Sequence, residues 1–228
     1  YLGASGQVDD RQLGLADLES GERLELKART IVNAAGPYVD GLNSAWGVTT
    51  EHRIVYSKGI HLIVPRLTTT EHQRVLAFFD DSGRLFYVIP MGIRSVIGTT
   101  DTRTDDPRAG VTDDDRAFLL DQINKRLDLP KPLTTDDVIA ERCGVRPLVV
   151  PNSGGDRTDV DWTSLSRKHE IEVDRGRSAI TILGGKLTDC LNVGEEVASA
   201  VESLGLPLQP DRRNWYGEPS KQTRAEFY

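Results

Sequence analysis

The amino-acid sequence predicts a mixed α/β (α+β) fold in which a layered domain is interrupted by a mostly antiparallel sheet. Two segments, residues 30–46 and 179–201, each combine an apolar strand, a turn of small residues or glycines and a helical pattern. Between them, residues 53–98 alternate apolar and polar positions in short runs, with no helical pattern. This order is typical of a nucleotide-binding layer whose chain leaves for a second domain and then returns.

The first unit follows a hairpin. Residues 14–26 alternate apolar and polar side chains on both sides of a Glu-Ser-Gly turn. An apolar strand at residues 30–32 leads into residues 33–37, Asn-Ala-Ala-Gly-Pro, whose small side chains let the backbone approach a neighbour closely. A helix is expected over residues 38–46, and we assign residues 1–50 to the layered domain.

Residues 51–150 are expected to form the inserted domain. Its predicted strands are residues 53–56, 61–64, 75–79, 85–89, 95–98 and 138–145, with an Asp-Asp-Ser-Gly hairpin turn at residues 80–83. Thr112 can cap a helix that Pro130 ends. The apolar residues at helical spacing in this helix are Phe118, Leu119, Ile123 and Leu127.

The rest of the chain is predicted to return to the first domain. Residues 152–161 are polar and glycine-rich, which indicates an exposed loop. Residues 169–183 read as a second hairpin, and Gly-Gly-Lys at residues 184–186 leads into a helix. We assign residues 151–205 to the layered domain and residues 206–228 to a linker or the start of a C-terminal helical domain.

The chain is expected to hold only part of its layered domain. A natural N-terminus seldom opens directly on a hairpin, and two strand–turn–helix units are too few for a doubly wound sheet. Residues 30–32 and 179–183 are therefore expected to lie in one layer of an incomplete domain.

Composition excludes several classes of protein. The formal charge of −7 and the lack of a dense Lys/Arg stripe argue against nucleic-acid binding. No apolar run approaches the roughly 18 residues that a membrane-spanning helix needs, so the visible part is expected to be soluble. Cys143 and Cys190 form no metal-ligand pattern, and we expect two small buried thiols in a reduced, cytoplasmic setting.

Five short motifs occur in a specific order. They are Asn-Ala-Ala-Gly-Pro at 33–37, Lys-Gly-Ile-His-Leu-Ile-Val-Pro at 58–65, Ile-Gly-Thr-Thr-Asp at 97–101, Gly-Val-Arg-Pro-Leu at 144–148 and Gly-Gly-Lys-Leu-Thr at 184–188. In this order the motifs resemble the FAD-dependent glycerol-3-phosphate dehydrogenases, a family of the amino-acid oxidase-like flavoprotein superfamily. The resemblance covers residues 28–200.

The resemblance implies FAD as cofactor and a three-layer FAD-binding domain interrupted by an antiparallel substrate domain. Carried over position by position, the implied cofactor-binding residues are Asn33, Ala35, Gly36, Gly184, Gly185, Lys186, Leu187 and Thr188. The family's opening Gly-x-Gly-x-x-Gly and its ribose-binding acid have no counterpart in this sequence. The chain taken alone is therefore expected to be an inactive fragment, with its ability to retain FAD left open.

For the substrate, the resemblance implies Arg146, Arg167 and Lys186 as binding residues. Planar guanidinium groups hold phosphate oxygens in a fixed direction, which suits a substrate with nearly two negative charges. For Arg146 the alternative is a structural ion pair with Glu141 or Asp137. For Lys186, an anion site at a helix start competes with a turn that is merely geometric.

Catalysis is assigned, through the same resemblance, to His61, Arg146 and Lys186. A histidine with a near-neutral pKa suits the base that takes the C2 hydroxyl proton, although a lone histidine in an apolar strand is also common in a core. Arg146 has too high a pKa to be a base and fits an electrostatic clamp. Residues 98–101 and Thr188 are open to hydrogen bonds with the flavin or with their own backbone.

One segment departs from the family. After Lys-Leu-Thr at residues 186–188, many relatives continue with Thr-Tyr-Arg, whereas this chain has Asp-Cys-Leu at residues 189–191. If the arginine of the relatives assists the substrate or the flavin, another residue must do so here.

The resemblance implies oxidation of glycerol 3-phosphate to dihydroxyacetone phosphate, with hydride transferred to FAD and electrons passed to a quinone. It also implies a cytoplasmic protein, peripheral on the inner face of the membrane, and leaves a homodimer open. The alternatives are a related flavin amine or amino-acid oxidase, marked by a single carboxylate-binding arginine, and a catalytically inactive fragment that acts as a binding module.

Overall fold

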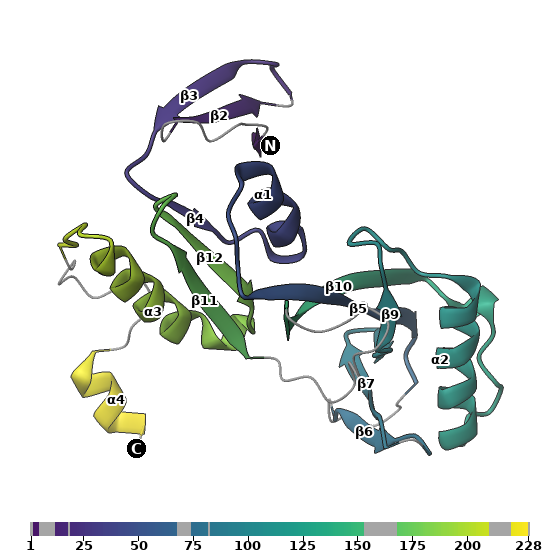
Figure 1. The fold of residues 1–228 in the computed structure, drawn as a ribbon. Coiled ribbons are helices and arrows are strands. Elements are labelled where there is room, and N and C mark those ends of the chain that lie inside the picture. Colours follow the sequence, from purple (N-terminus) through teal and green to yellow (C-terminus); the bar gives the residue numbers. More distant parts are fainter. Residues whose placement is uncertain are drawn as a thin grey trace.

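The structure is a computed structural model that describes residues 2–4, 12–17, 19–67, 74–81, 83–152, 168–209 and 220–227. Within these residues the strands form three sheets (Figure 1). The first sheet is a small antiparallel one made of β1 (Leu2–Ala4), β2 (Gln12–Asp17) and β3 (Arg23–Lys27). It contains the predicted first hairpin, β2–β3, and adds one strand that the pattern did not predict.

The second sheet carries both strand–turn–helix units. It consists of β4 (Ile31–Asn33), β11 (His169–Asp174) and β12 (Ala179–Gly184), in the order β11-β12-β4. β12 runs parallel to β4, with Ala179 opposite Ile31 and Thr181 opposite Asn33. The prediction that these two distant segments share one layer is therefore confirmed.

Helices follow both parallel strands. β4 leads into the 3-10 turn η1 (Gly36–Tyr38) and helix α1 (Val39–Trp46), and β12 leads into η4 (Leu187–Asp189) and α3 (Cys190–Ser203). α1 packs on β4 and β12, while α3 packs on β11 and β12. Figure 1 shows the sheet between the two helices. The first sheet and the short helix α4 (Lys221–Phe227) lie outside this layer.

The third sheet is antiparallel and has six strands. Its strands are β5 (His52–Pro65), β6 (Leu76–Phe79), β7 (Leu85–Met91), β8 (Arg94–Gly98), β9 (Thr102–Thr104) and β10 (Ala140–Pro151). The order is β10-β5-β8-β7-β6, and β9 also pairs with β5. The mostly antiparallel sheet is confirmed.

Two predicted strand boundaries are wrong. Residues 53–56 and 61–64 belong to the single strand β5, because its middle part pairs with β10 along one edge and with β9 along the other. β10 continues to Pro151 instead of ending at residue 145. Pro147 does not stop β10 because this strand lies at the edge of the sheet, where a missing backbone donor is tolerated.

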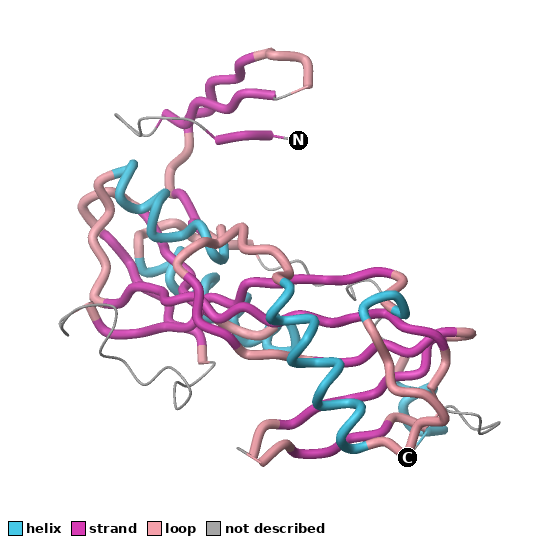
Figure 2. The backbone as a smooth tube through the Cα atoms, turned by 90° about the vertical axis from the view of Figure 1, so that its right-hand side faces the viewer, coloured by secondary structure: helices cyan, strands magenta, loops and turns pink. Residues whose placement is uncertain are grey.

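Helix α2 (Asp113–Arg126) covers one face of the six-stranded sheet (Figure 2). It begins with a capping box formed by Thr112 and Asp115, so the cap predicted at Thr112 is confirmed. Leu119 and Ile123 are fully buried against the sheet, whereas Phe118 is 37% exposed. The core between helix and sheet contains Ile60, Leu62, Val64, Phe86, Val88, Ile97, Leu119, Leu120 and Ile123.

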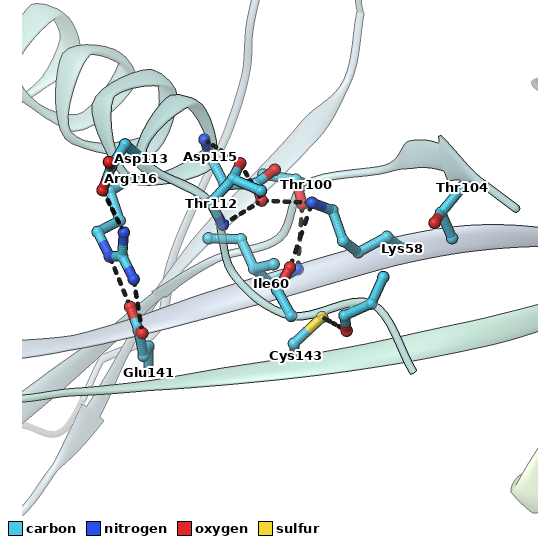
Figure 3. A network of polar contacts seen from close by, with 12 residues as sticks. Lys58, Ile60, Thr100, Thr104, Thr112, Asp113, Asp115, Arg116, Glu141 and Cys143 are labelled. Atoms are coloured by element: carbon cyan, nitrogen blue, oxygen red, sulfur yellow. Dashed lines mark hydrogen bonds and ion pairs between the residues drawn. The ribbon is translucent and has the colours of Figure 1, made fainter. Parts of the chain in front are cut away.

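A buried ion pair fixes α2 to β5 (Figure 3). Lys58 Nζ lies 2.5 Å from Asp115 Oδ2, and both side chains are less than a tenth exposed. The same carboxylate oxygen accepts hydrogen bonds from the backbone N–H and the hydroxyl of Thr112. Burial alone would raise the pKa of Asp115, but the hydrogen bonds from Lys58 and Thr112 outweigh it and hold the pKa below its usual value.

The two cysteines differ in their surroundings. Cys143 is half-buried, donates to Ala109 O at 3.0 Å and has a pKa that burial raises. Cys190, at the start of α3, is exposed, so the expectation of a buried thiol is wrong there. The helix start leaves its side chain outside the packed layer.

Candidate active site

The face of the antiparallel sheet opposite α2 carries the histidine of the Lys-Gly-x-His motif and the arginine of the Gly-Val-Arg-Pro motif. Along β5, Ile60 and Leu62 point into the core beneath α2, so the alternating positions Ser57, Gly59 and His61 lie on the other face. Register pairing places Arg146 of β10 directly opposite Ser57. Residues opposite one another share a face of the sheet, so this face holds both His61 and Arg146.

Arg146 lies over a glycine. An added β-carbon on Gly59 would collide with the terminal nitrogens of the Arg146 guanidinium. From this seat Arg146 donates to Thr99 Oγ1 at 3.2 Å and pairs with Asp101 Oδ1 at 3.4 Å. The Ser57 hydroxyl also donates to Asp101 Oδ1. The carboxylate thus orients the guanidinium from the loop that follows β8.

The ion-pair partners considered for Arg146 are engaged elsewhere. Glu141 binds Arg116 through two hydrogen bonds, at 2.7 and 2.8 Å. Asp137 accepts from the backbone and hydroxyl of Thr134 in a turn. The alternative in which Arg146 pairs with Glu141 or Asp137 is therefore wrong about the partner, since Arg146 pairs with Asp101.

His61 also lies against a glycine. It is paired with Gly98 of β8, and a β-carbon on Gly98 would be 2.7 Å from His61 Cδ2. Burial lowers the pKa of His61, and the positive charges of Arg146 and Arg142 lower it further. Both effects favour the neutral imidazole, which is the protonation state that a base requires.

A cavity of about 250 Å³ opens beside Arg146. Its polar lining comes from the loop after β8, from β10 and from the start of β7, and consists of Arg84, Tyr87, Thr99, Thr100, Asp101 and Arg146. Thr100 Oγ1 is occupied by the backbone N–H of Ile60 at 3.0 Å, so Thr100 fixes the loop to β5. The loop 98–101 therefore forms part of the cavity wall and is also anchored to β5.

Two glycine turns at the ends of the parallel strands adjoin this sheet. Gly184 has φ +66°, and a β-carbon there would be 2.6 Å from Val149 Cγ2 and 3.6 Å from Pro147 O, both on β10 next to Arg146. On the other side, the Tyr56 hydroxyl donates to Pro37 O at 2.9 Å. The fold thus brings the Asn-Ala-Ala-Gly-Pro and Gly-Gly-Lys turns to the same end of β5 and β10.

Asn33 shapes the first turn. Its side-chain nitrogen donates to Val39 O at 3.0 Å and to Asn43 Oδ1 at 2.8 Å, and its oxygen accepts from Ala35 N at 3.3 Å. The side chain is buried and its bonding is used within the chain. Any contribution of Asn33 to a cofactor site is therefore the geometry it gives to Ala35 and Gly36, where Gly36 has φ +55°.

The second turn is open. Gly185 has φ +96°, Lys186 and Thr188 are exposed, and Leu187 is 89% exposed despite its apolar side chain. Left-handed glycines, an uncovered leucine and a cation fit one end of a planar, partly apolar and electron-accepting ring such as that of FAD. The residues present therefore fit the flavin end of this cofactor.

Asp189, where the chain departs from the Thr-Tyr-Arg of many relatives, lies beside strand β11. Its carboxylate is 3.0 Å from Nδ1 of His169, an ion-pair distance without hydrogen-bond geometry. Glu196 lies 3.1 Å from Nε2 of the same ring. His169 faces Gly184 across the hairpin, so both carboxylates lie close to the glycine turn.

Of the remaining sequence-derived candidates, Arg167 lies outside the described residues. Sequence reasoning did not single out Arg84, Tyr87 or the role of Gly59. Gly59 could have been found, because a glycine within a strand often marks a close approach of another group. Nothing local in the sequence distinguishes Arg84 or Tyr87.

Across the described ranges, no cluster of three or more His, Cys, Asp or Glu side chains could hold a metal ion. Nor does any helix in that part of the chain have the length and apolar character needed to cross a membrane.

Comparison with known families agrees with the geometry. Residues 5–164 match the family described as FAD dependent oxidoreductase, which is well over half of the chain. The chain belongs to the FAD-dependent oxidoreductase family. FAD is the cofactor of this family, in agreement with the fit of the second glycine turn.

Individual relatives narrow the comparison. The chain is 29% identical to the mitochondrial glycerol-3-phosphate dehydrogenase of Bos taurus over 198 residues, and 30% identical to the aerobic glycerol-3-phosphate dehydrogenase of Staphylococcus aureus over 206 residues. These alignments cover 86% and 87% of the chain but only 26% and 35% of the relatives. The chain thus spans about a quarter to a third of the relatives it matches.

A solved structure shows the same fold. The glycerol-3-phosphate dehydrogenase of Bacillus halodurans, solved in complex with FAD, superposes with a TM-score of 0.74 at 27% identity. The match covers 92% of this chain and 40% of that protein. The resemblance that the five motifs suggested is confirmed at the level of family, fold and cofactor.

Proposed function

We propose that a protein containing this chain is an FAD-dependent glycerol-3-phosphate dehydrogenase, which oxidises sn-glycerol 3-phosphate to dihydroxyacetone phosphate. The observation that carries the proposal is the cavity lined by Arg146, on the face of the sheet that also carries His61; there Arg146 is held over Gly59 and oriented by Asp101. A neutral base and an oriented guanidinium on one face of the sheet are the groups that this oxidation requires.

FAD, when bound, supplies the acceptor for the hydride that leaves C2 of the substrate. In the proposed chemistry the chain accepts the proton that must leave together with the hydride. A ring nitrogen of His61 takes the proton of the C2 hydroxyl, so that one hydride and one proton leave and a ketone remains. His61 can do this at neutral pH because burial and two nearby arginines keep it unprotonated.

Arg146 is the proposed clamp. Its planar fork can hold a substrate oxygen that gains negative charge as the ketone forms, and its direction is fixed by Thr99 and Asp101. The guanidinium is about a quarter exposed, so it is partly desolvated, which strengthens its attraction to an anion. Lys186 is proposed to supply positive charge at the cofactor, next to the glycine turn.

Further parts of the proposal rest on the resemblance. We propose that a quinone takes the electrons and that the protein lies peripherally on the inner face of the cytoplasmic membrane, with a homodimer as its assembly. We also propose Arg167 as a further substrate-binding residue. The domain division is proposed as 1–50 with 151–205 for FAD, 51–150 for the substrate and 206–228 for a linker or helical domain.

The cavity itself weighs against an amine or amino-acid oxidase. Such an enzyme needs one arginine for a carboxylate, whereas Arg84 lines this cavity together with Arg146. With Arg146 placed at the reacting carbon, Arg84 adds a second cation for the charged end of the substrate.

The test uses the full-length protein purified with its flavin. Steady-state oxidation is measured with an artificial dye acceptor and with a short-chain quinone, for glycerol 3-phosphate, glycine and sarcosine. The proposal expects turnover with glycerol 3-phosphate alone, with dihydroxyacetone phosphate as product. Turnover of glycine or sarcosine would instead support an amine or amino-acid oxidase. A folded protein without flavin would support a catalytically inactive binding module.

A further inference from the structure

The cavity beside Arg146 contains a second cation with a different set of partners. Arg84 follows the turn between β6 and β7, where its backbone N–H donates to Asp80 Oδ1 at 2.8 Å and its carbonyl accepts from Asp80 N at 2.8 Å. Its guanidinium reaches across the cavity wall, and Nη2 donates to the backbone carbonyl of Asp101 at 3.1 Å. Both arginines of the cavity therefore converge on Asp101.

The two arginines differ in whether a carboxylate neutralises their charge. The Asp101 carboxylate pairs with Arg146 and also accepts from Ser57. The Arg84 guanidinium donates only to the neutral backbone carbonyl of Asp101. Within the described part of the chain, no carboxylate forms an ion pair with Arg84. The cavity thus holds two guanidinium charges and one carboxylate, an excess of positive charge that comes from Arg84.

The setting of Arg84 favours an anionic ligand. Its side chain is half-buried, and its hydrogen bond to a carbonyl uses one of the five N–H donors of a guanidinium. A partly desolvated cation without a counter-charge is stabilised when an anion enters beside it. Thr99 and Tyr87 add further polar groups to the same wall.

We propose that Arg84 binds the phosphate group of the substrate and sets the preference of this site for phosphate monoesters over neutral alcohols. The identity of the rest of the ligand rests on the proposed function, whereas the phosphate subsite rests on the cavity alone. Arg146 then acts at the reacting carbon and Arg84 at the charged end. The two hydrogen bonds between Arg84 and Asp80 anchor the backbone of Arg84 before β7.

The experiment measures binding of inorganic phosphate to the full-length flavoprotein by titration calorimetry, in a chloride buffer of constant ionic strength. Arg84→Met removes the charge and keeps most of the apolar stem. Arg94→Met is the matched control, because Arg94 is an exposed arginine at the start of the neighbouring strand β8, outside the cavity. The Kd for phosphate is expected to rise at least tenfold in Arg84→Met, about 1.4 kcal/mol, and to stay within twofold in the control.

A second variant guards against misfolding. Arg84→Lys keeps the charge but loses the planar fork, and its Kd is expected to rise at least threefold. Phosphate binding within twofold of the wild type in a folded Arg84→Met protein overturns the proposal, and so does a wild type that binds no phosphate. If Arg84→Met does not unfold cooperatively, equal binding by Arg84→Lys and wild type overturns it.

Turnover separates this inference from the proposed function. With glycerol 3-phosphate and glycerol as paired substrates, Arg84→Met is expected to lose at least tenfold of the discrimination between them, mainly through KM for the phosphate ester. A wild type that binds phosphate through Arg84 but oxidises no glycerol 3-phosphate would refute the proposed function and leave the phosphate subsite standing. If the wild type oxidises glycerol 3-phosphate and Arg84→Met discriminates between the two substrates as well as the wild type does, the phosphate subsite is refuted and the proposed function stands.

Discussion

The guanidinium of Arg146 lies against the backbone of Gly59, where an added β-carbon would occupy the same space as its terminal nitrogens. Gly59 stands in the middle of β5, two residues before His61, so it sets the height of the arginine above the strand that carries the proposed base. The conformation of Gly59 is an ordinary extended one, and its role is to leave room.

Gly59→Ala should therefore damage catalysis more than stability. The new methyl group displaces the Arg146 guanidinium, and we expect a loss in kcat/KM for glycerol 3-phosphate of roughly 1.5 to 3 kcal/mol, the range for a hydrogen bond to a charged group. Gly144→Ala is the matched control, because Gly144 lies directly opposite on β10 and a β-carbon there has nothing within 4 Å. Equal losses in the two variants would refute this reading of Gly59.

Arg146→Lys tests the planar fork itself. The charge is retained, but one amine cannot bind both Thr99 and Asp101 and still reach the substrate. The fall in kcat/KM should therefore correspond to a loss of transition-state stabilisation of roughly 1.5 to 3 kcal/mol. Asp101 keeps a cationic partner, and the melting temperature should change little. A lower melting temperature with near-normal kinetics would instead make Arg146 a structural ion-pair residue.

The pH dependence of the reaction should report the setting of His61. Because burial and two arginines lower its pKa, the acid limb of kcat/KM is expected below 6.5, the usual histidine value. Arg142→Met removes one of the two positive charges and should move this limb to higher pH, with the plateau unchanged. A limb that stays fixed in Arg142→Met, while the His61 ring itself titrates at higher pH by NMR, would show that His61 is not the base.

Lys186→Met should affect the flavin and leave the fold intact. Lys186 is exposed beside the left-handed Gly185, so removing its charge costs little packing. Slower flavin reduction and weaker sulfite binding are expected, since both depend on local positive charge. Lys125→Met, an exposed lysine of α2, is the control. Unchanged sulfite affinity in Lys186→Met would reduce Lys186 to a turn residue.

The Lys58–Asp115 pair predicts a large effect on stability. Lys58→Met leaves Asp115 buried without its cation, which should destabilise the fold by roughly 3 to 5 kcal/mol in chemical denaturation, with partial recovery when Asp115→Asn is added. The pKa of Asp115 is lowered, so the stability it contributes is present at neutral pH and is lost as the pH falls below 3.8. A Lys58→Met protein as stable as the wild type would contradict the claim that this ion pair stabilises the fold.

Periodicity and turn chemistry predict most of the fold. The parallel pairing of β4 with β12 follows from two strand–turn–helix units, and the start of α2 follows from Thr112 and Asp115. The length of β5 does not follow, because Ser-Lys-Gly at residues 57–59 reads locally as a break. Its pairing with β10 and β9, which are distant in sequence, overrides that local preference.

The site was predictable only in part. His61 and Arg146 stand in recognisable motifs, and the structure places them on one face of the sheet. The partner of Arg146 could not be predicted, because Asp101 lies 45 residues away in sequence and meets it only through the register of β5 with β8 and β10. Arg84 likewise enters the cavity from a hairpin turn whose sequence indicates nothing beyond the turn.

The central proposal is that a protein containing this site oxidises glycerol 3-phosphate with FAD. Its most direct test is anaerobic mixing of the full-length flavoprotein with sn-glycerol 3-phosphate, followed by absorbance at the flavin bands and by product analysis. The account predicts bleaching of the flavin with one equivalent of dihydroxyacetone phosphate formed per flavin, and loss of that bleaching in Arg146→Met. A flavin that stays oxidised with glycerol 3-phosphate, or that is bleached by glycine or sarcosine instead, would contradict it.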